Sequence, residues 1–169
     1  WGRGETDVVF DLPAVTTSLV PLCAPARILD TRVGGSTVDG GHAGVGRIAA
    51  GGVYELPVAG RAGVPVGAVS VVLNVTAVLP GGGGFVTVFP CGQAVPNASN
   101  LNFGAGAVIP NSVLARVGSG GRVCFYSFSE TDLLVDVSGY VLDAAALVPL
   151  TAPARILDTR VGGSTVDGG

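Results

Sequence analysis

Apolar and polar residues alternate with a period of two along much of this chain. In residues 68–78 one face of the alternation is wholly apolar and the other is mixed. The apolar face carries Val69, Val71, Leu73 and Val75, and the mixed face carries Ser70, Val72, Asn74 and Thr76. This pattern predicts a half-buried β-strand, because a helix would repeat its apolar positions every three or four residues. Further strands are predicted at 53–58, 85–89, 113–117, 122–128 and 132–141, most of them rich in Val, Phe, Tyr or Leu.

Stretches rich in glycine, proline or asparagine separate these predicted strands. They lie at 51–52, 80–84, 96–97, 110–111 and 118–121. We expect the stretch 80–84 to close a hairpin between its two neighbouring strands, and 118–121 to close another. Short strands at this spacing predict an all-β sandwich or barrel of antiparallel sheets, and of the two we expect the sandwich, immunoglobulin-like or jelly-roll-like. Only residues 143–147 favour a helical turn, which we expect to be a linker.

One segment of the chain is written twice. Residues 20–41 and 148–169 differ only at Cys23, which becomes Thr151, and Arg27 corresponds to Arg155, a period of 155 − 27 = 128 residues. That period is the size of a domain. The residues before each copy also match, since ETDVVFDL from Glu5 resembles ETDLLVDV from Glu130. We therefore expect three pieces: the tail of a preceding repeat (1–19), a complete repeat (20–147) and the head of a following repeat (148–169).

These pieces predict a tandem or head-to-tail array, in which the head of one repeat docks at a junction. The alternative is one closed domain in which the two copies pair as equivalent strands. Two carboxylates on the last predicted strand lie four residues apart and share a face, and their simplest partners are Arg27 or Arg32. The residues predicted at the junction are Arg27, Asp30, Arg32, Asp132, Asp136, Arg155, Asp158 and Arg160.

Composition limits the classes of function. Hydrophobic residues make up 48% of the chain and charged residues 12%, which favours a folded core over disorder. No apolar run reaches the roughly 18 residues of a membrane helix, so no membrane insertion is expected. The net charge is −3 and all nine basic residues are arginines without a basic cluster, which argues against a nucleic-acid partner.

The sequence also lacks the residue patterns that common catalytic sites need. His42 is the only histidine, and no serine stands in a Gly-x-Ser-x-Gly elbow, so neither a zinc site nor a catalytic triad is expected. We therefore expect no enzyme and no cofactor. A calcium site built from Asp side chains and loop carbonyls stays open as an alternative. Tyr54, Tyr140 and Trp1 are candidates for a sugar-stacking platform, although core positions suit them better.

The chain has three cysteines. A bridge between Cys91 and Cys124 would close a loop of 33 residues, and two free buried thiols are the alternative. A disulfide indicates an oxidising compartment outside the cytoplasm. Cys23 is unmatched, so we expect either a thiol that bonds to a neighbouring unit or a tolerated substitution.

Four segments together resemble a known family of repeats. They are PARILDTR, GVPVGAVSVVLNVTAVLPGGGGFVTVFPCG, SNLNFGAGAVIPNSVLARVGSGGRVCFY and LLVDVSGYV. The family is the PARxLDTR-type tandem β repeat of extracellular and cell-surface proteins in high-GC Gram-positive and related filamentous bacteria. The resemblance covers nearly all of 20–147 and implies a secreted, cell-surface or fibre-forming β module, not an enzyme. It maps the paired cysteines of such repeats onto Cys91 and Cys124, and Cys23 departs from its pattern.

We therefore expect a structural repeat of an extracellular fibre or surface stalk, whose partners are neighbouring repeats or subunits. The preceding tail would lie against the next head, as in β-augmentation. The alternative is an accessory module that binds cell-wall glycan or another polysaccharide as part of a larger secreted protein.

Overall fold

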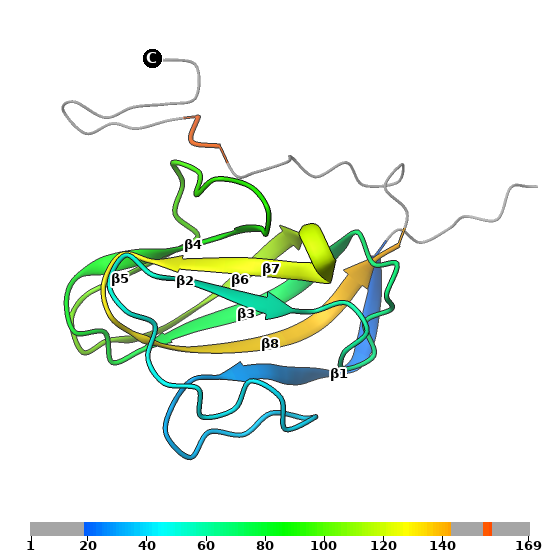
Figure 1. Ribbon diagram of the computed structural model, residues 1–169, viewed down its shortest axis with the longest axis horizontal. Helices are drawn as coiled ribbons and strands as arrows, with labels where there is room; N and C mark the ends of the chain where they lie inside the picture. The colour runs from blue at the N-terminus through cyan, green and yellow to red at the C-terminus, as the bar shows by residue number, and fades with distance from the viewer. Residues whose placement is uncertain (1–18, 143–153, 157–169) are drawn as a thin grey trace, which may run out of the picture.

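The computed structural model describes residues 19–142 and 154–156, and within them the chain is an all-β sandwich (Figure 1). The predicted tail 1–18, the helical turn expected at 143–147 and most of the predicted head 148–169 lie outside these residues. The sandwich has eight strands and one short 3₁₀ turn, Ser119–Gly121. The strands are β1 (Leu19–Asp30), β2 (Val53–Pro57), β3 (Ser70–Val78), β4 (Gly84–Pro90), β5 (Leu101–Phe103), β6 (Val108–Arg116), β7 (Arg122–Ser127) and β8 (Asp132–Val141).

The strands form two antiparallel sheets of four, in the orders β1-β8-β3-β6 and β2-β7-β4-β5. The pairing is nested: β1 pairs with β8, β2 with β7, β3 with β6 and β4 with β5. Eight strands wound in this way make a jelly roll, so the sandwich prediction is confirmed in its jelly-roll form. The nesting places the first and the last strand side by side.

Both predicted hairpins are wrong. β3 and β4 flank the glycine stretch 80–84, yet β3 lies in one sheet and β4 in the other. The stretch 118–121 likewise carries the chain from β6 to β7 across the sandwich, with only an isolated bridge between Gly118 and Arg122. The apolar face of each sheet is covered by the other sheet, and in this jelly roll every consecutive pair of strands except β4 and β5 is divided between the two sheets.

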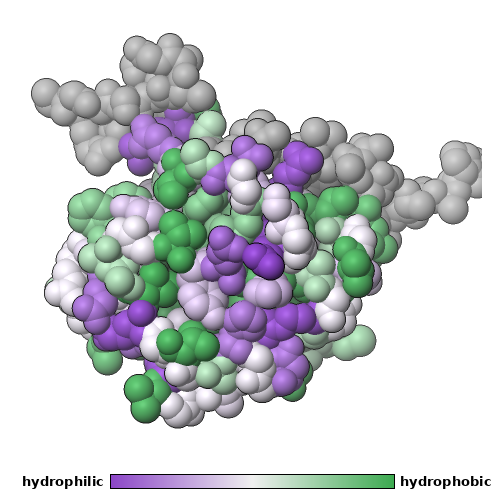
Figure 2. Space-filling model, viewed as in Figure 1, coloured by the Kyte–Doolittle hydropathy of each residue, from purple (hydrophilic) through white to green (hydrophobic). Residues whose placement is uncertain are grey.

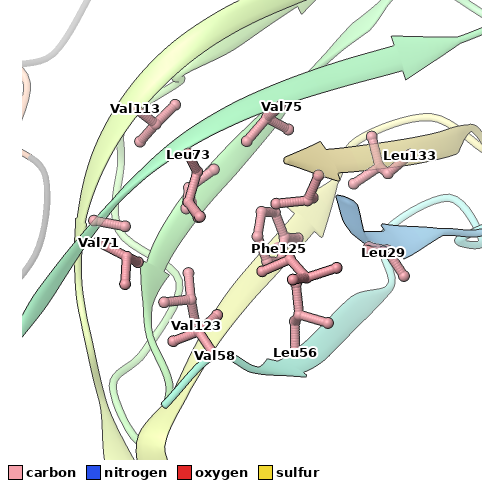
Figure 3. Packing of buried hydrophobic residues seen from close by; sticks show 14 of the residues in the cluster. Leu29, Leu56, Val58, Val71, Leu73, Val75, Val113, Val123, Phe125 and Leu133 are labelled. Atoms are coloured by element: carbon pink, nitrogen blue, oxygen red, sulfur yellow. The ribbon is translucent and has the colours of Figure 1, made fainter. Parts of the chain in front are cut away.

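The core lies between the two sheets, and the predicted alternation of β3 places its residues there (Figure 3). Val71, Leu73 and Val75 have no exposed surface, while Val72, Asn74 and Thr76 alternate with them and are half-buried. Phe125 of β7 is fully buried among them. Burial of one such aromatic or aliphatic side chain stabilises the fold by about 1.5–3 kcal/mol, so this layer is the main source of stability.

Three further features of the strands differ from the prediction. β1 and the three-residue β5 were not among the predicted strands, and β6 runs through Pro110, which was predicted to be a breaker. Proline is tolerated there because β6 is an edge strand.

The surface is mixed: on the face in Figure 2, apolar residues form separate spots among polar ones.

Candidate junction site

The first copy of the repeated segment forms β1, which pairs with β8 as the edge strand of its sheet. The register places Leu19 opposite Val141, Arg27 opposite Asp136 and Leu29 opposite Val135. A shift in register between Pro21 and Ala26 interrupts the pairing, and Ile28 and Leu29 beyond it are fully buried. The head predicted at 20–41 is thus an integral strand of the same sandwich as the tail at 130–137.

The contact between β1 and β8 forms a seam, and Arg27 and Asp136 make its central ion pair. Arg27 Nε donates to Asp136 Oδ1 over 2.8 Å, and its Nη2 donates to Asp136 Oδ2 over 3.1 Å. The hydrogen bond to Asp136 is the main reason that the pKa of Arg27 is raised. The side chains of Arg27 and Asp136 are 35% and 19% exposed, so this two-bond ion pair is partly shielded from water. Their pairing matches the partner that the shared face of Asp132 and Asp136 suggested.

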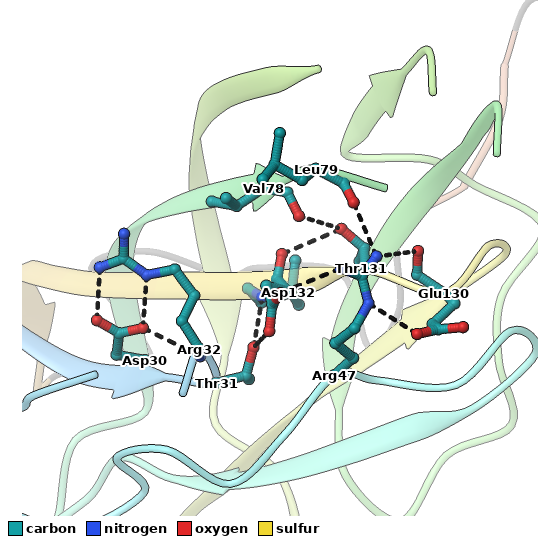
Figure 4. Close-up of polar contacts among 10 residues, drawn as sticks. Asp30, Thr31, Arg32, Arg47, Val78, Leu79, Glu130, Thr131 and Asp132 are labelled. Carbon is teal, nitrogen blue, oxygen red and sulfur yellow. Dashed lines mark hydrogen bonds and ion pairs between the residues drawn. The ribbon is translucent and has the colours of Figure 1, made fainter. Parts of the chain in front are cut away.

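Asp30 and Arg32 pair with each other and not with the last strand. Arg32 Nε and Nη2 donate to the two carboxylate oxygens of Asp30 over 2.9 and 2.8 Å (Figure 4). Arg27 Nη1 lies 3.8 Å from the same carboxylate. Asp30 is buried, and the hydrogen bond from Arg32 holds its pKa below the usual value.

Asp132 has different partners from those expected, Arg27 or Arg32. Thr31 Oγ1 donates to its Oδ1 over 2.8 Å, and Arg47 Nη1 lies 3.3 Å from its Oδ2 (Figure 4). The same Thr31 hydroxyl accepts the backbone N–H of Leu133. Arg47 intervenes because the loop after β1 crosses the start of β8, where Ile48 and Thr131 form a bridge. Asp132 therefore ties this loop, together with Thr31, to the start of β8.

Two arginines that sequence reasoning missed hold the loops around the seam. Arg47 Nε lies 2.8 Å from Glu130 Oε1, and its Nη2 donates to Leu79 O over 2.7 Å. Arg61 donates to both carboxylate oxygens of Asp39 over 2.8 Å and to Ile28 O over 3.1 Å. The hydrogen bond from Arg61 lowers the pKa of Asp39 far below its usual range. The only signal for either residue was a lone cation in a glycine-rich loop.

The loop after β1 also makes hydrogen bonds to part of that strand's backbone. Val38 N–H donates to Arg27 O over 2.9 Å, next to the bond from Arg61 to Ile28 O. These two carbonyl groups already have partners within the domain. A preceding tail that lay against the head by β-augmentation would have to find other backbone groups or displace this loop.

The second copy of the segment has different surroundings from the first. Residues 154–156 belong to no strand, and Ile156 is 81% exposed whereas its counterpart Ile28 has no exposed surface. Arg155 Nη1 lies 3.5 Å from Asn97 Oδ1. The two predicted junction residues Asp158 and Arg160 lie outside the described residues. In the part of the second copy that the structure describes, the two copies do not pair as equivalent strands.

The disulfide between Cys91 and Cys124 is confirmed, and the alternative of two free thiols is wrong. The Cα atoms are 5.1 Å apart, and the bridge spans 33 residues. With Phe89 and Tyr126 it forms a small cluster separate from the main core. Cys23 is a free, exposed thiol on β1.

Tyr54 and Tyr140, two of the three candidates for a sugar-stacking platform, do not come together in the described residues. Tyr54 on β2 and Tyr140 on β8 lie in different sheets, and both pack partly against the core. The Tyr54 hydroxyl lies 2.7 Å from His42 Nδ1, and Trp1 lies outside the described residues. A different group of rings is present: Phe85 and Phe128 stack with centroids 5.2 Å apart, and Tyr126 lies 6.0 Å from Phe85.

Metal ligands do not gather within residues 19–142 and 154–156: no three His, Cys, Asp or Glu side chains there could hold one ion. Nor does this part of the chain contain a helix long and apolar enough to cross a membrane. Comparison with known proteins gives no relative: no family model matches the chain, and no curated protein matches it.

Proposed function

We propose that this protein is a structural repeat of an extracellular fibre or surface stalk, in which like domains follow one another head to tail. The role is mechanical, and the residues that serve it are those of the seam between β1 and β8. The partners are neighbouring repeats, in one long chain or in separate subunits.

The observation that carries this proposal is the relation between the duplication and the fold. The repeated segment begins with an edge strand that the sandwich needs, because Ile28 and Leu29 are fully buried. The identical residue Ile156 is 81% exposed in the second copy. An apolar residue in this sequence context has its place in the core of a further domain, which supports a following repeat.

The disulfide supports the extracellular part of the proposal. Bridges of this kind persist outside the cytoplasm, where thiols are not kept reduced. Cys91 lies just after β4 and Cys124 within β7, so the bridge links neighbouring strands of one sheet. It cross-links the sheet opposite the one that contains the seam.

The test is a series of longer chains in which residues 42–169 are appended once, twice and three times after Gly169. Each addition keeps the period of 128 residues and supplies the domain that follows each head. We expect negative-stain electron micrographs to show rows of domains at a constant spacing and angle. Domains that are connected but take all relative orientations would contradict a structural role.

A second candidate function is binding of a cell-wall glycan, and the stacked pair Phe85 and Phe128 favours it. Phe128 is 53% exposed, and aromatic faces of this kind can pack against sugar rings. Affinity electrophoresis in gels that contain cell-wall polysaccharide tests this function. Retardation that is lost in Phe128→Ala would favour glycan binding, whereas equal mobility in every gel would exclude these polymers as ligands.

A further inference from the structure

We propose that the place beside β8, which β1 fills, is also a binding site for the second copy of the repeated segment in the same chain. Residues 147–158 would then form the edge strand, with Arg155 opposite Asp136 and Ile156 in the core position of Ile28. The two copies would exchange at a single site. This inference goes beyond the fibre role and does not depend on it.

The second copy carries the side chains by which the first is held. Arg27 binds Asp136, Thr31 binds Asp132 and Asp39 binds Arg61. Their counterparts Arg155, Thr159 and Asp167 are identical residues. The single difference, Cys23 against Thr151, falls on an exposed position of β1. These three side-chain contacts of the first copy are therefore available to the second.

The connection from β8 to the second copy has a suitable length. Leu147 corresponds to Leu19, which lies opposite Val141 at the end of β8. In the same register only residues 142–146 would join β8 to the second copy. Five residues suit a β-hairpin loop. Closing this short loop costs less chain entropy than closing the chain from β1 to β8, where Asp30 and Leu134 pair across more than a hundred residues.

The two arrangements bury nearly equal apolar surface. With β1 in place, Ile28 is buried and Ile156 is 81% exposed. Exchange would bury Ile156 and expose Ile28, so the buried apolar surface would stay about the same. Neither arrangement gains the hydrophobic contribution of both copies, because β8 can pair with only one of them: its other side pairs with β3.

The main test uses the full chain and the two matched isoleucines. In Ile28→Asp the first copy can no longer enter the core, and we expect the second copy to replace it, with a melting temperature lowered by less than about 5 °C. Ile156→Asp alone should leave the melting temperature unchanged. The double variant should lose about 15 °C or more, or fail to fold, because a buried charge then has no substitute strand. If Ile28→Asp is as unstable as the double variant, the proposal is wrong.

A cysteine trap identifies the strand directly. In a Cys23→Thr background, Tyr140→Cys is combined with both Val20→Cys and Val148→Cys. The first pair faces across β1 and β8, and the second pair would face across the exchanged strand. We expect mass spectrometry of the oxidised monomer to show bridges from position 140 to both 20 and 148. A bridge to position 20 alone, or bridges to 148 only between chains, would overturn exchange within the chain.

Discussion

Arg27 and Asp136 lie 109 residues apart in sequence and are joined by two hydrogen bonds across β1 and β8. The pair closes the seam between the first and the last strand of the jelly roll. Because Asp136 belongs to β8, it serves whichever copy of the repeated segment fills the edge. It is thus the residue on which the strength of the seam can be measured without ambiguity.

Replacement of Asp136 by Asn should lower the free energy of unfolding by about 1–2 kcal/mol, because the Arg27 guanidinium loses its charged acceptor in a partly shielded place. The matched control is Glu55→Gln, which breaks an Arg–carboxylate pair of 2.9 Å whose side chains are about half exposed. That change should cost less than about 0.5 kcal/mol. Urea unfolding followed by fluorescence compares the two, and equal losses would refute the importance of the seam pair.

Removal of the disulfide in the Cys91→Ala, Cys124→Ala variant should lower stability by roughly 3–4 kcal/mol, because the unfolded chain regains the entropy of the 33-residue loop. In force spectroscopy, each unfolding step should also lengthen by about 110 Å, at roughly 3.4 Å per freed residue. Cys23→Thr is the control and should change neither value. A step length that does not depend on the bridge would contradict a closed disulfide.

Leu73 should be among the most sensitive core positions. It is fully buried on β3, so Leu73→Ala should cost about 2–5 kcal/mol from lost burial and the cavity that remains. Leu114→Ala on the neighbouring strand β6 is the control, since Leu114 is 48% exposed and should tolerate the change within about 0.5 kcal/mol. Thermal denaturation of both variants checks the contrast, which should vanish only if the core is assigned to the wrong face.

Gly118 should not accept a side chain. A Cβ there would collide with the backbone N and O of Cys91, and backbone atoms cannot move aside as a flexible side chain can. We expect Gly118→Ala to cost about 1–3 kcal/mol. Gly67→Ala is the control, because no atom lies within 4 Å of its Cβ position. Denaturant midpoints of the two variants and the parent chain check this prediction. An unchanged midpoint for Gly118→Ala would show that Gly118 and Cys91 are not in close contact.

Stability should fall in acid. Hydrogen bonds from Arg32 and Arg61 hold the pKa values of Asp30 and Asp39 below the usual 3.8. Because the unfolded state then takes up protons more readily, the contribution of both groups is complete above about pH 5 and is lost as the pH falls through 4 toward the lower folded values. Burial lowers the pKa of His42, which adds a loss that begins as the pH falls below 6.5.

Urea midpoints measured from pH 7 to pH 2.5 check this dependence. Asp39→Asn should be less stable at neutral pH and should lose less on acidification than the parent chain. Midpoints that stay constant or rise between pH 5 and pH 3 would contradict the assignment of these carboxylates.

The sequence predicted most strands but not their order. The alternation that includes Val71, Leu73 and Val75 predicts a strand, because alternation is a local property of the sequence. Whether β3 and β4 share a sheet depends on long-range pairing, so the glycine stretch between them was misread as a hairpin. β1 was missed because Pro21 and Pro25 interrupt its pattern, and its pairing resumes only at Ala26.

The candidate site could be predicted only in part, for a similar reason. The pair Arg27 and Asp136 followed from the shared face of two carboxylates on one strand. Arg47 and Arg61 bind partners that lie in loops, and loops have no period from which a contact can be predicted. Asp132 was therefore assigned to the wrong cation.

The register that sets Leu19 opposite Val141 brings both ends of the sandwich out at the same side. Tension applied through these ends would peel β1 from β8 one hydrogen bond after another, whereas strands loaded from opposite ends resist shear along their full length. Domains linked in this way would also project from one side of the axis of the array. A stalk of such domains would therefore lengthen under load by opening its seams.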